Sequence, residues 1–200
     1  HNEDFVEIFE PKEPGQRQSK GCLLIVADGM GGYQAGEVAS QGAVQIISNV
    51  YYQDPDPDVR AALTRAIEQA NLSIHQEAQR TPSRAGMGTT VVAAVIRGRE
   101  LFLANVGDSR AYLMRGGLVR QITHDHSFVR EQVRAGILSE EEARVHPQRN
   151  VITRAIGSKP EVLVETYYYD WQPGDALLLC SDGLSEYVNE EDMKELLSRY

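Results

Sequence analysis

Acidic residues beside glycine recur along this chain at the ends of apolar segments. Asp28 and Gly29 follow the apolar run 22–26, and Asp182 follows the apolar run 177–180 after one serine. A carboxylate at the end of a buried strand is costly to desolvate unless it is paired or binds a cation. Two strands that each end near Asp-Gly therefore indicate one shared acidic site.

Two further acids lie beside predicted strands and are candidates for the same site. Asp4 lies in the segment Asn2-Glu3-Asp4, and Asp108 follows Gly107 and precedes Ser109. Two carboxylates about 4 Å apart repel by about 4 kcal/mol at an effective dielectric near 20, so such a cluster favours bound cations. Oxygen ligands select hard ions, which makes Mg²⁺ or Mn²⁺ the expected metal. The residues alone leave open whether each Asp-Gly is instead a simple turn.

The elements that would position these acids are those of an α+β protein. Apolar and β-branched runs predict strands over 5–9, 22–27, 89–96, 100–106, 110–114, 162–169 and 176–180. Helical spacing predicts helices over 35–52, 58–80 and 190–199, with short helical pieces between 124 and 158. Residues 10–20 are expected to form a polar loop, and residues 89–114 a meander of adjacent antiparallel strands. This order predicts sheet packed on sheet with helices outside.

Composition narrows the class of protein. The chain has 200 residues, enough for one sizeable domain, and a formal net charge of −9, which argues against a nucleic-acid partner. No apolar run approaches the length of a membrane-spanning helix, so we expect no membrane contact and a cytoplasmic location. Cys22 and Cys180 are expected to be buried free thiols in a reducing compartment. A cysteine-dependent phosphatase would need arginine six positions later, where Asp28 and Glu186 stand.

Seven segments of the chain resemble, in order, the motifs of the metal-dependent protein phosphatases of the PP2C (PPM) family in their bacterial form. They are Asn2-Glu3-Asp4, Asp28-Gly29-Met30-Gly31-Gly32, Ala35-Gly36-Glu37-Val38-Ala39-Ser40, Gly86-Met87-Gly88-Thr89-Thr90, Gly107-Asp108-Ser109-Arg110-Ala111-Tyr112, Asp125-His126-Ser127 and Ser181-Asp182-Gly183-Leu184. The resemblance implies a four-layer αββα sandwich of two mainly antiparallel sheets flanked by helices. It also implies a single domain over residues 1–200, with a flap insertion at about 124–158.

The resemblance implies a role for each acid. Asp28 would bridge two Mn²⁺ or Mg²⁺ ions, with the Gly29 carbonyl oxygen as a further ligand. Asp182 would bind one of these ions, and Asp4 and Glu3 would act directly or through metal-bound water, with Asp4 the ligand and Glu3 beside the ligands. Asp108 together with Asp182 matches the position of a third ion.

The implied reaction is hydrolysis of phosphoserine and phosphothreonine in proteins. A water that bridges the metals would attack phosphorus, so Asp28 and Asp182 are the expected catalytic residues. No substrate-binding residue is identified. The partners would be phosphorylated proteins, the products of serine/threonine kinases in bacterial signalling, and we expect the phosphatase to act as a monomer.

The chain departs from the family pattern at its two ends. The pattern has a phosphate-binding arginine before Asn2, and an Asp-Asn pair in a strand–helix–strand segment that would follow Tyr200. The resemblance therefore implies truncation at both ends and slower turnover by these 200 residues alone. Two alternatives stay open: a catalytically weak PP2C-like domain that binds phosphoproteins, and a hydrolase of small phosphate esters on the same scaffold.

Several other residues have a structural interpretation beside the functional one. His124, Asp125 and His126 are expected to hydrogen-bond at the base of the flap rather than to bind metal. Tyr167–Tyr169 are expected to alternate between core and surface. Ser139 is expected to cap a helix whose first turn holds Glu140–Glu142. Arg110 could pair with an acid or contact substrate phosphate, and Arg149 and Arg154 could touch a phosphopeptide.

Overall fold

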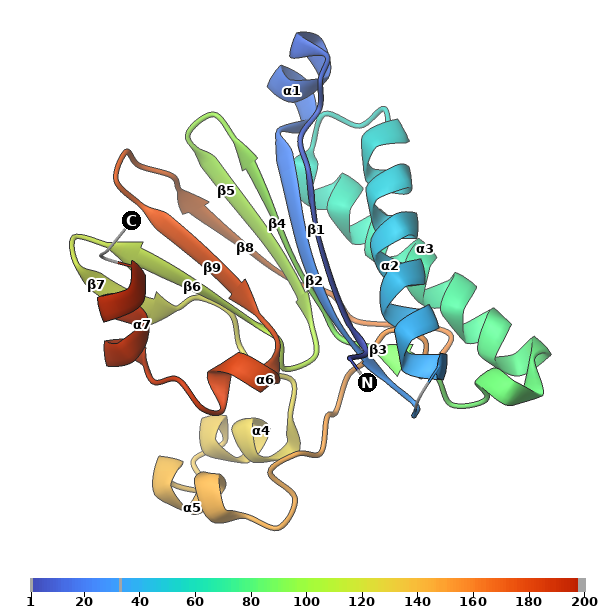
Figure 1. Ribbon diagram of the computed structural model, residues 1–200, viewed down its shortest axis with the longest axis vertical. Helices are drawn as coiled ribbons and strands as arrows, with labels where there is room; N and C mark the ends of the chain where they lie inside the picture. The colour runs from blue at the N-terminus through green and yellow to red at the C-terminus, as the bar shows by residue number, and fades with distance from the viewer. Residues whose placement is uncertain (1, 33, 198–200) are drawn as a thin grey trace.

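The computed structural model describes residues 2–32 and 34–197, and it shows two antiparallel sheets stacked face to face between helices (Figure 1). The larger sheet has the strand order β1-β2-β4-β5-β8, with the short strand β3 paired to β2. Its strands are β1 (Asp4–Phe9), β2 (Cys22–Met30), β3 (Gly88–Thr89), β4 (Val91–Arg97), β5 (Glu100–Val106) and β8 (Glu165–Asp170). The smaller sheet has the order β7-β6-β9, from β6 (Arg110–Arg115), β7 (Leu118–Gln121) and β9 (Ala176–Cys180).

Helices form the outer layers. The long helices α2 (Gln34–Gln53) and α3 (Val59–Arg80) cover the larger sheet, and α7 (Glu190–Leu197) packs on the smaller one (Figure 1). The shorter helices are α1 (Pro14–Lys20), a 3₁₀ helix (Pro82–Arg84), α4 (Phe128–Arg134), α5 (Glu140–Val145) and α6 (Asp182–Ser185). The α+β class and the predicted layer order are confirmed. No helix in the described part of the chain is long and apolar enough to cross a bilayer.

The central strands of the larger sheet, β2, β4 and β5, are covered on both faces. On its outer face, residues such as Ile25 and Val95 pack against Ile47 and Leu63 of the long helices. On its inner face, Val26, Val92 and Leu103 pack against Leu113 and Ile122 of the smaller sheet and its flank. Strands buried on both faces have near-continuous apolar sequences, which explains the runs seen in β2, β4 and β5.

The predicted meander over residues 89–114 is wrong in one respect. Strands β4 and β5 pair as expected, but β6 lies in the other sheet, where it pairs with β7 and β9. The chain changes sheets at Gly107, whose φ of +111° is strained for any residue with a side chain. Strand periodicity indicates which faces are buried but does not show which strand lies alongside, so the change of sheet is a tertiary result.

Other local predictions need smaller corrections. Part of the expected loop 10–20 is helix α1, which the apolar pattern could not reveal because its sequence is almost entirely polar. Strand β2 continues to Met30, since Gly29 and Met30 pair with Thr89 and Gly88. Strand β7 was not predicted, β8 is shorter than the expected strand 162–169, and Asp182 begins helix α6. The last predicted helix, 190–199, is described as far as Leu197, and its final two residues lie outside the described residues.

The start of helix α3 rests on a side-chain cap. Asp58 accepts a hydrogen bond from the Ala61 N–H at 3.1 Å. Since such a cap satisfies a backbone donor that the helix leaves unpaired, Asp58→Ala should lower the free energy of unfolding by about 1 kcal/mol in urea titration. Glu68→Ala, an exposed change on the same helix, should stay within about 0.5 kcal/mol of the parent. Equal values for the two variants would contradict the capping role.

Candidate metal centre

Three carboxylates from distant parts of the sequence meet at one end of the sandwich. The register of β1 and β2 sets Asp4 directly opposite Asp28. Strand β9 delivers Ser181 and Asp182 to the same place, where the Ser181 hydroxyl donates to Asp4 Oδ2 at 3.0 Å. The structure therefore brings together Asp4 at the start of β1, Asp28 in β2 and Asp182 at the start of α6, elements that Figure 1 labels.

The cluster is electrostatically unfavourable as it stands. Burial, together with the charges of Asp4 and Asp182, raises the pKa of Asp28 to about 8. Burial and then the charges of Asp182 and Asp125 raise the pKa of Asp108 to about 6. Asp108 thus lies near enough to Asp182 to feel its charge. Carboxylates are held together in this way where a cation or a shared proton offsets their repulsion.

The backbone beside Asp28 is packed too closely for any side chain. A Cβ on Gly29 would lie 2.2 Å from the Gly36 carbonyl oxygen and 2.7 Å from the Glu3 carbonyl oxygen. A Cβ on Gly36 would lie 1.9 Å from Glu3 Oε2, so the Glu3 carboxylate rests directly on the first turn of α2. The positive end of the helix dipole favours negative charge there. Glu3 therefore lies against both helix α2 and the backbone of Gly29, the residue that follows Asp28.

Hydroxyl groups that the sequence did not single out hold the acid-bearing backbone. Thr90 exchanges two hydrogen bonds with Asp28: its N–H donates to the Asp28 carbonyl at 2.9 Å, and its Oγ1 accepts from the Asp28 N–H at 3.1 Å. Thr89 Oγ1 donates to the same carbonyl at 2.8 Å. Thr90 Oγ1 also lies 2.7 Å from Ser109 Oγ, next to Asp108. These residues stand within the motif segments, but their partners are far away in sequence.

The donor set fits a hard divalent cation. All the candidate ligand atoms are oxygens, and Gly29 leaves its backbone unobstructed by a side chain. Among residues 2–32 and 34–197, no three His, Cys, Asp or Glu side chains converge tightly enough to hold a metal ion without moving. The carboxylates would therefore have to close around the ions, which is expected because their mutual repulsion is relieved when a dication binds.

The side chains of residues 124–126 form hydrogen bonds, as predicted. Arg110 forms a forked ion pair with the Asp125 carboxylate, with Nη2 and Oδ2 2.6 Å apart. Of the two roles considered for Arg110, the structure therefore shows pairing with an acid. His124 Nδ1 and His126 Nε2 both contact Glu165, at 3.1 and 2.7 Å. Burial alone would raise the pKa of Glu165, but these hydrogen bonds outweigh it and lower the pKa.

The other structural interpretations are also confirmed. Ser139 and Glu142 form a reciprocal capping box at the start of α5. Tyr167 and Tyr169 pack between the sheets, whereas Tyr168 is exposed. Cys180 is buried as predicted, whereas Cys22 is only partly buried. Burial still raises the pKa of both thiols, that of Cys180 to about 11, so neither is suited to nucleophilic attack.

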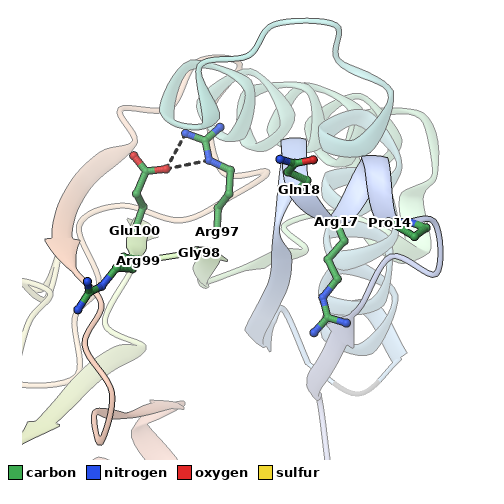
Figure 2. A pocket seen from close by; sticks show the side chains of 7 residues that line it. All are labelled: Pro14, Arg17, Gln18, Arg97, Gly98, Arg99 and Glu100. Atoms are coloured by element: carbon green, nitrogen blue, oxygen red, sulfur yellow. Dashed lines mark hydrogen bonds and ion pairs between the residues drawn. The ribbon is translucent and has the colours of Figure 1, made fainter.

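A concavity of about 650 Å³ lies at the opposite end of the sandwich from the acidic cluster, between α1 and the β4–β5 turn (Figures 1 and 2). It is lined by Pro14, Arg17, Gln18, Arg97, Gly98, Arg99 and Glu100. Figure 2 shows Arg97 turned toward Glu100, with which it pairs at 2.9 Å, while Arg17 and Arg99 point elsewhere. The guanidinium groups that line this concavity do not converge on one point, so we do not propose an anion-binding site there.

Comparison with known proteins places this geometry in a family. The profile of the family described as protein phosphatase 2C matches residues 11–200. The serine/threonine phosphatase stp of Listeria innocua is 41% identical over 201 residues, which is 98% of this chain and 77% of the relative. The solved structure of the S. agalactiae serine/threonine phosphatase superposes with a TM-score of 0.89 at 37% identity, over 99% of this chain and 80% of that one.

A second solved structure bears on the acidic cluster. The catalytic domain of the serine/threonine protein phosphatase PstP was determined with two manganese ions, and it matches with a TM-score of 0.82 at 38% identity, over 99% of this chain and 78% of that one. The family profile, the relatives and the solved structures all agree with the motifs and the fold. The chain belongs to the protein phosphatase 2C family of serine/threonine protein phosphatases.

Proposed function

We propose that this protein hydrolyses phosphoserine and phosphothreonine in proteins, using divalent cations bound at the acidic cluster. The convergence of Asp4, Asp28 and Asp182, with the pKa of Asp28 raised to about 8, is the observation that carries the proposal. The relatives are themselves named phosphatases, which supports turnover over the binding of phosphoproteins alone. Its substrates would be the products of serine/threonine kinases in the cytoplasm, and it would act there as a monomer.

The proposed ligands follow from position in the cluster. Asp28, which lies close to both Asp4 and Asp182, would be shared by two ions, with the Gly29 carbonyl oxygen completing the set. Asp108 and Asp182 would together hold a third ion. The two manganese ions of the PstP structure support Mn²⁺ as the metal here, with Mg²⁺ as the other hard ion that this donor set accepts.

The residues of this chain would position the metal ions and provide the negative charge that binds them. Bound dications activate water at neutral pH and neutralise phosphoryl oxygens. Asp28 and Asp182 would hold the ions in place, while Thr90 keeps the Asp28 backbone rigid through its two hydrogen bonds. No side chain need attack phosphorus, in accord with the raised pKa of Cys180. The flap over residues 124–158, within the single domain that we propose, would border the substrate.

Removal and return of metal tests the proposed function. After treatment with a chelator, the purified protein should hydrolyse neither p-nitrophenyl phosphate nor a phosphothreonine peptide, and added Mn²⁺ should restore both activities. Phosphothreonine and phosphoserine peptides should react faster than a phosphotyrosine peptide of the same sequence. Absence of turnover at any Mn²⁺ concentration would favour a binding domain. A preference for small metabolite esters over phosphopeptides would favour the other alternative.

A further inference from the structure

The turn that carries Asp108 needs support from outside. It joins β5 of the larger sheet to β6 of the smaller one, and Asp108 is repelled there by Asp182. Gly107 opens the turn with φ +111°, and a Cβ there would lie 2.6 Å from the Thr90 Cβ. One side of the turn therefore packs directly on Thr90.

His126 also binds this turn. Its side chain is fully buried, and it bonds to both backbone groups of Gly107. The Gly107 N–H donates to His126 Nδ1 at 3.1 Å, and the His126 N–H donates to the Gly107 carbonyl at 2.9 Å. The Asn105 amide adds a longer contact to that carbonyl, at 3.3 Å. A single residue thus satisfies the donor and the acceptor of the glycine that precedes Asp108.

Glu165 favours the tautomer of the His126 ring that can accept the hydrogen bond from Gly107. Because Nδ1 accepts from Gly107, the proton of the neutral ring lies on Nε2, which donates to Glu165 Oε2 at 2.7 Å. The Arg154 guanidinium lies 3.3 Å from the same nitrogen and places a positive charge beside it. The contacts run from Glu165 on β8 through His126 to Gly107, and so to Asp108.

The contacts of Thr90 and His126 together connect the turn that carries Asp108 with the backbone of Asp28. Thr90 binds the backbone of Asp28 on one side and the Ser109 hydroxyl on the other. His126 binds the same turn at Gly107, through its ring and its backbone N–H. We propose that His126 is a positioning residue of the phosphatase, one that sets the place of the Asp108 carboxylate relative to Asp182 and Asp28 through its hydrogen bonds to Gly107. This inference rests on the proposed function and deepens it.

Two substitutions separate the contacts of His126. In His126→Asn the amide oxygen takes the place of Nδ1, so it accepts from Gly107 but loses Glu165. In His126→Gln the amide nitrogen takes the place of Nε2, so it donates to Glu165 but loses Gly107. Asn is smaller than Gln by one methylene, so purely structural damage should be greater in His126→Asn, which is the opposite of the order expected at Gly107, and melting temperatures will measure it.

The first readout needs neither metal nor activity. In the metal-free protein, amide hydrogen exchange by NMR should show Gly107 about tenfold less protected in His126→Gln than in His126→Asn, which should resemble the parent. The second readout is the Mn²⁺ concentration for half-maximal activity. It should rise about 10- to 100-fold in His126→Gln and by much less in His126→Asn. Equal behaviour of the two variants in both readouts would reduce His126 to a packing residue.

A second pair of variants applies if both His126 variants fail to fold. Glu165 is only partly buried at the edge of the larger sheet, so changes there are easier to accommodate. Glu165→Gln keeps an acceptor for Nε2–H and should preserve Gly107 protection, whereas Glu165→Met removes it and should lower that protection about tenfold. The same protection in both would overturn the proposal. A parent protein with no Mn²⁺-dependent turnover but with this exchange pattern would overturn the proposed function only.

Discussion

Asp28→Asn is expected to abolish Mn²⁺-dependent phosphatase activity and, at the same time, to raise the melting temperature of the metal-free protein. Loss of the shared ligand should lower kcat by about 10³-fold or more, which corresponds to about 4 kcal/mol of transition-state stabilisation. The gain in stability has a separate cause. Asn is neutral and nearly the same shape, so it relieves the repulsion by Asp4 and Asp182 that the buried carboxylate of Asp28 experiences.

The gain in stability should grow with pH. The pKa of Asp28 is about 8 in the folded protein, whereas an Asp side chain in an unfolded chain has a pKa of about 3.9. The folded state therefore binds more protons between these values, and the metal-free parent loses stability as the pH rises through that window. Asp28→Asn lacks this loss. Its advantage in melting temperature should be small at about pH 5 and larger at about pH 8, as calorimetry in the presence of a chelator will show.

A matched control is available at the other end of the sheet. Asp170 is exposed on β8, and Asp170→Asn should change neither the Mn²⁺-dependent rate nor the pH dependence of melting. If Asp28→Asn kept more than about 1% of the parent rate, Asp28 would not be a metal ligand that turnover requires. If its melting temperature fell at about pH 8, the carboxylates would not be in conflict in the metal-free protein.

Gly36→Ala and Gly42→Ala are expected to have opposite effects, although both replace glycine by alanine in helix α2. At Gly36 the new methyl group would lie 1.9 Å from Glu3 Oε2 and 2.9 Å from the Gly29 carbonyl carbon. Such overpacking costs about 1–3 kcal/mol, and relief requires Glu3 and β2 to move from the acidic cluster. At Gly42 a methyl group meets nothing within 4 Å, so the higher helix propensity of alanine should stabilise the protein by about 0.5–1 kcal/mol.

The two glycine variants should also separate in activity. Gly36→Ala should lower the Mn²⁺-dependent rate about tenfold or more, because displacing Glu3 also disturbs the backbone of Gly29. Gly42→Ala should keep the parent rate while its melting temperature rises by about 2–4 °C per kcal/mol of added stability. Urea titrations and initial rates on a phosphothreonine peptide measure both effects. Parent-like stability and rate for Gly36→Ala would show that Glu3 can move without consequence for the site.

Sequence patterns were enough to predict the parts of this protein that depend on burial within one helix or strand. Helical spacing located α2 and α3, and apolar runs located β2, β5 and β9, because these patterns report burial within a single element. The Asp-Gly pairs after β2 and β9 could be read as an acidic site because a buried, unpaired carboxylate is costly wherever it occurs. The order of the motifs then sufficed to identify the family.

The support of the site, in contrast, depends on how the helices and sheets pack together. The sequence does not predict helix α1, because a short polar helix has no apolar periodicity. It does not predict that β6 belongs to the second sheet, because the sequence of a strand does not show which strands pair with it. The contacts of Glu3 with Gly36, of Thr90 with Ser109 and of His126 with Gly107 join residues 19 or more positions apart. Such contacts exist only when the sheets and helices have packed. The acids themselves could therefore be found in the sequence, whereas the contacts that hold them could not.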